Sequence, residues 1–147
     1  MHALLGVAWA WILREIWGEL QPRWIVLAIF GSILPDLEHF VYVFTYGRKD
    51  IYSQTIFSFL RQKKWRMLTV YIEHGHKNNT NLMYHNVYVV VGLGVAVSVC
   101  WMFEWHSWVV VMGAMIIHYL FDIIDDVMML GRVNPNWKRW GNGRKKK

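Results

Sequence analysis

Long runs of apolar residues, separated by short polar segments, dominate the pattern along this chain. The clearest are residues 82–103, centred on VYVVVGLGVAVSVCWMF, and residues 107–124, SWVVVMGAMIIHYLFDII. A helix that crosses the bilayer core needs about 20 mostly apolar residues, whereas buried strands run to about 4–8. Both runs therefore predict membrane-spanning helices, capped at their starts by residues 79–81 and by Ser107.

Two further runs extend the prediction to a bundle of about four transmembrane helices. The run 24–46 opens after Pro22 and is interrupted by Pro35, and the run 3–17 is shorter. Residues 49–77 mix aromatic and basic side chains, which predicts an interfacial amphipathic segment on the membrane surface or, equally, a solvated helix packed on the bundle. The expected fold is an all-α integral membrane domain over 1–130, followed by a basic, Trp-rich tail over 131–147.

Composition supports this interpretation. The 147 residues are 55% hydrophobic and only 18% charged, so the chain is too apolar for a disordered protein and unlike an ordinary soluble domain. The mean hydropathy of +0.20 averages very apolar runs with very basic ones. The single cysteine, Cys100, excludes a disulfide framework and cysteine-based structural zinc, and we expect it to be a small buried hydrophobe. The N-terminus lacks a basic region and a cleavage site, so no cleaved signal peptide is expected.

The distribution of basic residues predicts the topology. With four spans, 14 of the 16 Lys and Arg residues fall on the side that holds the N-terminus, the connection 47–81 and the tail. The positive-inside rule then places this side, and both termini, in the cytoplasm, with the chain in the cytoplasmic (inner) membrane. Basic segments beside the membrane attract anionic lipids by about 1 kcal/mol per residue, and the tail also suits an acidic protein partner. Nucleic acid is a less favoured partner.

Ionisable residues inside the apolar runs point to a site, because a carboxylate at the centre of a membrane helix costs about 2.5–3.5 kcal/mol. They come in pairs at helical spacing: Asp36 and His39 are three positions apart, and His118 and Asp122 are four positions apart. The members of each pair therefore share a helix face. The predicted topology brings these residues to one level, near the cytoplasmic leaflet. Mixed His and carboxylate donors from facing helices suit a divalent metal, with zinc favoured and manganese or iron as alternatives. The candidate ligands are His2, Asp36, His39, His85, His118 and Asp122.

Other polar residues receive different roles. Glu38 lies about 100° around the helix from the face of Asp36. We expect it to be either an outer partner, meaning a residue that holds a metal ligand in place without binding the metal, or a competing ligand. Glu38 and Asp125 are the candidates for a general base or a bridging ligand. Asp125 and Asp126 could also simply end their helix in water. We expect His74 and His76 in an exposed loop, and His106 on the opposite side of the membrane.

These motifs resemble those of the membrane-bound metal-dependent hydrolases of bacteria and archaea, the YdjM-like inner-membrane proteins. Leu34-Pro35-Asp36-Leu37-Glu38-His39 is similar to their Pro-Asp-x-Asp-His motif, with Glu in place of the second Asp. His85-Asn86 and His118 to Asp122 are similar to their central and last motifs, and His2 to their early His. The resemblance covers residues 1–126, apart from 49–77, and implies metal-dependent hydrolysis.

The expected function is hydrolysis of phosphoesters or lipid head groups at the cytoplasmic leaflet. A divalent metal would activate water, and the basic loop 61–66 would attract an anionic substrate. Two alternatives belong to other classes. The first is a non-enzymatic scaffold or lipid-binding subunit with a structural metal or an internal polar cluster. The second is a haem-binding membrane protein, with His39 and His118 as axial ligands.

Overall fold

The computed structural model describes residues 1–79 and 82–138, without the side chains of 74–79. Within these residues every regular element is helical, which confirms the expected all-α class. In chain order the elements are α1 (His2–Trp17), α2 (Pro22–Ile33), the 3-10 turn η1 (Leu34–Asp36), α3 (Leu37–Phe44), α4 (Ile51–Arg61), α5 (Trp65–Asn79), α6 (Val87–Met102), α7 (His106–Leu130) and the 3-10 turn η2 (Pro135–Lys138).

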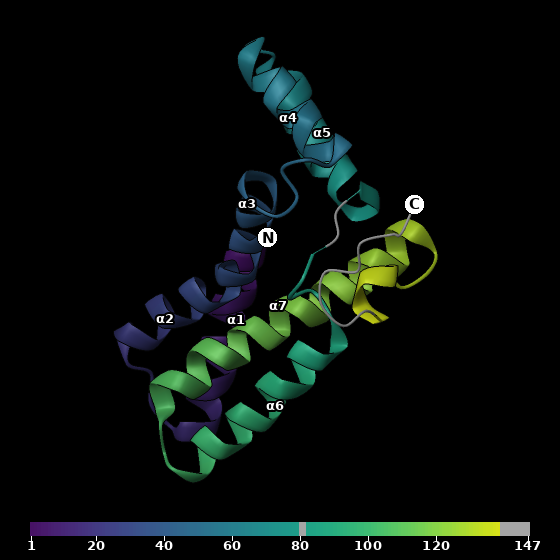
Figure 1. Ribbon diagram of the computed structural model, residues 1–147. Helices are drawn as coiled ribbons and strands as arrows, with labels where there is room; N and C mark the ends of the chain where they lie inside the picture. The colour runs from purple at the N-terminus through teal and green to yellow at the C-terminus, as the bar shows by residue number, and fades with distance from the viewer. Residues whose placement is uncertain (80–81, 139–147) are drawn as a thin grey trace.

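Four helices form a bundle in which α7 is central. Helices α1 and α2 pack against each other and against α7, and α6 packs on α7 as well (Figure 1). The indole of Trp9 in α1 donates a hydrogen bond to the Val110 carbonyl of α7, 3.1 Å away. Gly6 and Gly31 allow close approach of the helices, because a Cβ at either position would lie 2.5 Å from a backbone oxygen of the facing helix. The bundle core consists of Ala10, Leu13, Trp24, Ala28, Cys100, Val109, Val110 and Ala114, so Cys100 is the buried hydrophobe expected.

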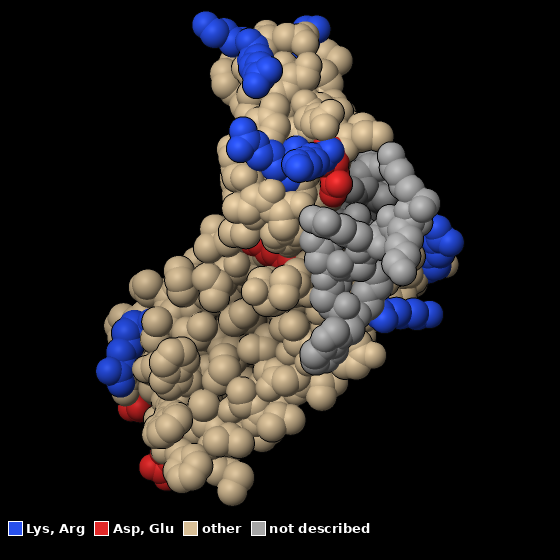
Figure 2. All heavy atoms as spheres, in the orientation of Figure 1, with Lys and Arg blue, Asp and Glu red and all other residues tan. Residues whose placement is uncertain are grey.

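Two helical segments are long and apolar enough to cross a membrane. These are Pro22–Phe44, which combines α2, η1 and α3, and His106–Leu130, which is α7. Helices α1 and α6 have 16 residues each and at 1.5 Å per residue are about 24 Å long, short of a bilayer core of about 30 Å. Large apolar side chains nevertheless cover the outside of the bundle, including Val26, Phe30, Val91 and Val95. Figure 2 shows this face of the bundle almost free of charged atoms.

Pro35 interrupts the second apolar run where the sequence predicts a break. A proline has no N–H to donate, and its ring clashes with the preceding helical turn. Residues Leu34–Asp36 therefore form a 3-10 turn between α2 and α3. Backbone N–H groups in such a turn bond three residues back instead of four. This change leaves the Ser32 carbonyl without its usual partner, the backbone N–H four residues later. The carbonyl instead accepts from Nδ1 of His118 in α7.

The start of α6 lies later than predicted. The cap is Asn86, whose side chain accepts from the Val89 N–H at 3.0 Å, and of the predicted caps at 79–81, residues 80 and 81 lie outside the described residues. An Asn at this position satisfies a helix N–H group that has no backbone partner. Residues 82–86 thus form an irregular connection instead of the first helical turn, so His85 lies in a loop. The start of α7 also differs from the prediction, since the helix begins at His106 and its N-cap residue is Trp105 instead of Ser107. The helix continues through Asp125 and Asp126 to Leu130, and Gly131, with a φ of 65°, ends it.

The interval 49–77 contains two helices instead of one. Helices α4 and α5 pack against each other and project from the end of the bundle (Figure 1). Tyr52, Ile56 and Leu68 of this α4–α5 hairpin form a second core with Tyr42 and Leu82. The connecting turn carries the basic residues 61–66, and Figure 2 shows Lys and Arg gathered there. The hairpin is therefore anchored to the bundle through α3 and the connection before α6.

The chain after α7 folds back onto the bundle. In η2 the side chain of Trp137 is only 1% exposed, and its indole N–H donates to the Asp126 carboxylate at 2.8 Å. The ring lies edge-on to Tyr119, with a centroid separation of 5.9 Å. The segment that the sequence separates from the helical domain at Gly131 therefore packs on that domain as far as Trp137. Residues 139–147 of the predicted tail lie outside the described residues.

Candidate metal centre

One cavity of about 690 Å³ gathers most of the predicted site residues. It lies where the end of the bundle, the base of the α4–α5 hairpin and the C-terminal segment meet. Its lining includes five predicted ligands and both acidic residues of the following turn of α7, namely His2, Asp36, His39, His85, Asp122, Asp125 and Asp126. The sixth predicted ligand, His118, is completely buried beside them, within ion-pair distance of Asp36 and Asp122.

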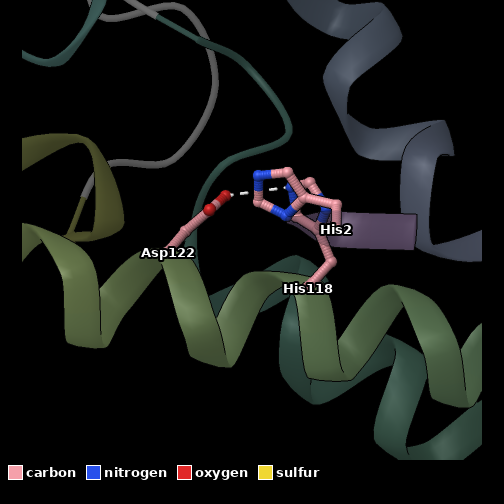
Figure 3. A group of neighbouring side chains, drawn as sticks. All are labelled: His2, His118 and Asp122. Carbon is pink, nitrogen blue, oxygen red and sulfur yellow. Dashed lines mark ion pairs between the residues drawn. The ribbon is translucent and has the colours of Figure 1, made fainter. Parts of the chain in front are cut away.

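His2, His118 and Asp122 form the tightest group. Their nearest donor atoms all lie within 4.8 Å of one another. Figure 3 shows the Asp122 carboxylate directed at the two imidazoles, which come from the start of α1 and from α7. The imidazoles are stacked, with centroids 4.0 Å apart, and Asp122 Oδ2 is 3.0 Å from His118 Nε2.

The backbone fixes the orientation of His118. Its Nδ1 lies 2.6 Å from the Ser32 carbonyl, which the 3-10 turn at Pro35 relieves of its helical partner. A carbonyl can only accept, so Nδ1 carries the proton and Nε2 presents a lone pair. The buried Nε2 has no hydrogen-bond partner and faces the carboxylates of Asp122 and Asp36.

Glu38 orients His85 in the same way. The Glu38 Oε2 atom lies 2.8 Å from His85 Nδ1, so the imidazole is held by a carboxylate from behind. The other oxygen, Oε1, accepts from the Tyr46 hydroxyl at 2.7 Å and from the backbone N–H groups of Met83 and Tyr84. His85 Nε2 then points toward Asp122 Oδ2, 3.5 Å away, and is buried without a hydrogen-bond partner. A carboxylate behind an imidazole is the usual support of a metal-binding histidine.

His85 lies outside the two helical segments that are long enough to cross a membrane, and its neighbours favour the protonated imidazole. Burial lowers the pKa of His85, but the carboxylates of Asp122 and Glu38 outweigh this effect and raise the pKa to about 9. Tyr52 on the cavity wall is kept neutral, because burial raises the pKa of its hydroxyl to about 12. The cavity therefore contains a protonated phenol beside its carboxylates.

The donor set fits a divalent metal. With metal–ligand bonds of about 2.0–2.2 Å, two donors on one ion lie about 3–3.5 Å apart. The separations of 3.0 Å and 3.5 Å from Asp122 to His118 and His85 fall in this range. Three buried imidazole nitrogens, His2 Nδ1, His85 Nε2 and His118 Nε2, have no hydrogen-bond partner. Leaving a buried polar atom unsatisfied costs about 1–3 kcal/mol, and imidazole nitrogens of this kind are donors that a divalent cation can use.

Glu38 occupies a different place from the other candidates. Its carboxylate does not line the cavity and has four partners on residues 46 and 83–85. This position favours the role of an outer partner over that of a general base. Asp125, by contrast, lines the cavity one helical turn beyond Asp122.

Several contributors were not predicted from the sequence. Tyr46 and the Ser32 carbonyl each hold one member of the cluster in place, while Tyr52 and Trp137 line the cavity. Every residue has a backbone carbonyl, so the sequence cannot show which one accepts from His118. The only available signal for Trp137 is its position in an Asn-Pro-Asn-Trp segment, which is typical of a turn that packs back on the fold.

The remaining predicted residues lie elsewhere. His106 packs between Trp17 and Trp24 near the start of α7, with centroids 4.5 and 5.9 Å away. The side chains of His74 and His76 lie outside the described part of the chain. The basic turn 61–66 is separated from the cavity-lining Glu73 of α5 by at least seven residues, or about 10 Å of helix. It can therefore affect a ligand in the cavity only through long-range electrostatics.

Comparisons with known proteins returned no matching family model, no similar curated protein and no similar solved structure. The similarity to the membrane-bound hydrolases thus consists of the short motifs around Asp36, His85 and His118, and it stays a prediction.

Proposed function

We propose that this protein is a membrane-bound metal-dependent hydrolase whose bundle carries a divalent cation at one end. The observation that carries the proposal is the pair of buried, unpartnered Nε2 atoms of His85 and His118 facing the carboxylate of Asp122. Each imidazole is fixed from behind by an acceptor. The protein has therefore pre-oriented two imidazole nitrogens and one carboxylate toward one another.

The size of the cavity favours catalysis over a purely structural ion. Structural zinc sites are closed by four protein ligands, whereas catalytic sites keep a position open to water or substrate. Here His2, Asp36 and Asp122 border about 690 Å³ of space, which suits a small-molecule site. A bound divalent cation would lower the pKa of water toward about 7 and polarise a phosphoryl oxygen. Asp125, on the cavity wall, is placed to accept the proton of that water.

The other wall of the cavity supports a lipid head group as the substrate. It is lined by apolar side chains, among them Ile72, Leu82, Phe121 and Leu130. Two more, Phe40 and Met129, are 65% and 64% exposed, so the cavity is continuous with the apolar outside of the protein. An amphipathic molecule could therefore place its polar end at the carboxylates and its apolar end along this wall. With four spans and cytoplasmic termini, the cavity would face the inner leaflet.

Metal analysis and a hydrolysis assay on the same preparations test the proposal. The protein is purified in detergent, loaded with Zn²⁺ or Mn²⁺, and assayed for the products released from micelles of phosphatidylglycerol or phosphatidic acid. We expect Asp122→Asn to lose both metal and activity, and His106→Gln, which lies away from the cluster, to retain both. A protein that binds metal but cleaves neither lipid would favour a scaffold with a structural ion. A wild type without metal would indicate an internal polar network, and a Soret band would indicate haem.

A further inference from the structure

The basic turn 61–66, which closes the α4–α5 hairpin, carries four cations. Arg61 ends α4, Lys63 and Lys64 lie in the connection, and Arg66 is in the first turn of α5. All four are exposed, and none of them forms an ion pair within the described part of the chain. The sequence has no Asp or Glu from residue 51 to residue 72. The basic turn therefore presents its charge to a partner outside the hairpin.

Backbone hydrogen bonds fix the shape of the basic turn. The N–H of Lys64 donates to the Phe59 carbonyl at 3.0 Å, and the N–H of Lys63 donates to the Leu60 carbonyl at 3.1 Å. This pair of bonds is the Schellman motif, whose left-handed position is usually glycine. Here Lys63 occupies it with a φ of 54°, a conformation that a Cβ atom disfavours. The turn thus has a fourth cation at a position where glycine would be less strained.

Two apolar side chains are exposed beside these cations. Trp65, at the start of α5, is 60% exposed, and Met67 is 52% exposed. Trp is enriched where a membrane meets water, because its ring is apolar and its N–H is polar. Basic residues combined with an exposed indole are typical of segments that bind the surface of an anionic bilayer. The combination favours lipid over a partner that is attracted by charge alone.

The basic turn lies close to the end of a candidate membrane span. Phe44 is the last residue of the segment Pro22–Phe44, and its ring contacts that of Phe57 in α4, with centroids 5.6 Å apart. Arg61 is four residues beyond Phe57, which is about 6 Å along the helix. The head-group region of a bilayer extends about 5–7 Å beyond the hydrocarbon core on each side. The long side chains of the turn can therefore reach that region.

We propose that the basic turn binds the anionic surface of the membrane that holds the bundle, with its cations on lipid phosphates and Trp65 among the head groups. Near such a surface each Lys or Arg strengthens binding about fivefold. The base of the same hairpin contributes Tyr52, Ile72 and Glu73 to the cavity wall. Lipid at the turn would thus hold this wall at the level of the head groups. The binding needs neither a metal nor hydrolysis, so the proposal is independent of the proposed function.

A fluorophore at the turn of the full-length protein tests the proposal. The exposed Gln62→Cys is labelled with the fluorophore NBD in a Cys100→Ala background, and the protein is reconstituted into lipid nanodiscs. The discs contain phosphatidylcholine alone or an equal mixture with phosphatidylglycerol, each with a lipid that carries a quenching nitroxide near its head group. We expect quenching in the mixed discs and little in the neutral discs. It should decrease in about 1 M salt, which shortens the screening length to about 3 Å.

Charge-removing variants identify the residues responsible. Lys63→Gly combined with Lys64→Gln removes two cations, so the ratio of bound to free turn in the mixed discs should fall about 25-fold. Because Lys63→Gly also relieves the left-handed backbone, the variant is expected to keep its fold, which circular dichroism checks. Arg23→Gln is the matched control. Arg23 is also exposed, but it lies at the other end of the segment Pro22–Phe44, so quenching at the turn should not change.

The other outcomes would overturn the proposal. Equal quenching in neutral and mixed discs would show that anionic lipid is not what the turn recognises, and no quenching in either would place the turn away from the bilayer. If polyglutamate then changed the NBD emission, the partner would be an acidic protein surface instead. Unchanged quenching in the double variant would show that Lys63 and Lys64 do not contribute.

Discussion

The carboxylate of Glu38 holds the imidazole of His85 across 47 residues of sequence, with 2.8 Å between Oε2 and Nδ1. This contact connects α3 to the start of α6 and determines which nitrogen of His85 faces the cavity. It also gives a testable prediction, because a neutral amide is a weaker partner for a metal-binding imidazole than a carboxylate.

Glu38→Gln should weaken metal binding without abolishing it. Partners of this kind typically contribute about 10–100-fold to metal affinity, so we expect an increase of this size in the dissociation constant for Zn²⁺, measured by competition with a chelating dye. Glu104→Gln, a replacement in the loop before α7, is the matched control and should leave the affinity unchanged. An unaltered affinity in Glu38→Gln would show that His85 is not a ligand.

Removal of metal should destabilise the wild type. A ligand present at 100 times its dissociation constant stabilises the folded state by about 2.7 kcal/mol, so a chelator should lower the midpoint of thermal unfolding. Asp122→Asn should unfold at the same temperature with and without the chelator, because the variant has no cation to lose. Equal chelator shifts in both proteins would contradict the assignment of Asp122.

Trp137 should matter for stability through one hydrogen bond. Trp137→Phe preserves most of the buried aromatic surface but removes the N–H that donates to Asp126. Hydrogen bonds to charged groups contribute about 1.5–3 kcal/mol, and we expect a loss in this range from chemical denaturation in detergent. Trp105→Phe, at a residue that is 55% exposed, should change the free energy of unfolding by less than about 0.5 kcal/mol. Similar effects of the two replacements would show that the C-terminal segment does not pack on α7 as described.

Gly31 should tolerate no side chain. A Cβ atom there would lie 2.5 Å from the backbone oxygen of Val111, so α2 and α7 would have to separate. Gly31→Ala is therefore expected to cost about 1–3 kcal/mol, as overpacking usually does. Gly92→Ala, where nothing lies within 4 Å of the new Cβ, should be neutral or stabilising by up to about 1 kcal/mol through helix propensity. Thermal unfolding of the two variants side by side measures the difference.

The sequence predicted the helical fold well because long apolar runs leave few alternatives. The run 3–17 corresponds to α1, and the expected interruption at Pro35 is present. Boundaries were wrong where local polar contacts compete with the helix. At Asn86 a side-chain cap delays the start of α6, and the division of residues 49–77 depends on the packing of α4 against α5. A four-span arrangement and the side of the membrane remain predictions.

The proximity of the candidate ligands could be predicted from the sequence, but the contacts among them could not. Helical spacing places His118 and Asp122 on one face, and the end-to-end order of the runs brings Asp36 and His85 to the same end. No periodicity relates Glu38 to His85 or the Ser32 carbonyl to His118, because these contacts join elements far apart in the sequence. The outer partners that orient each imidazole therefore became visible only in three dimensions.

The ring of Pro35 has an effect beyond its own helix. If Pro35→Ala restored an unbroken α-helix, the Ser32 carbonyl would return to the backbone ladder, and Nδ1 of His118 would lose its acceptor. The neutral imidazole could then move its proton to Nε2, where the Asp122 and Asp36 carboxylates would accept it. The tautomer of a side chain in α7 is thus selected by a residue in the second apolar run. A single change there would convert a lone-pair donor into a hydrogen-bond donor without altering any candidate ligand.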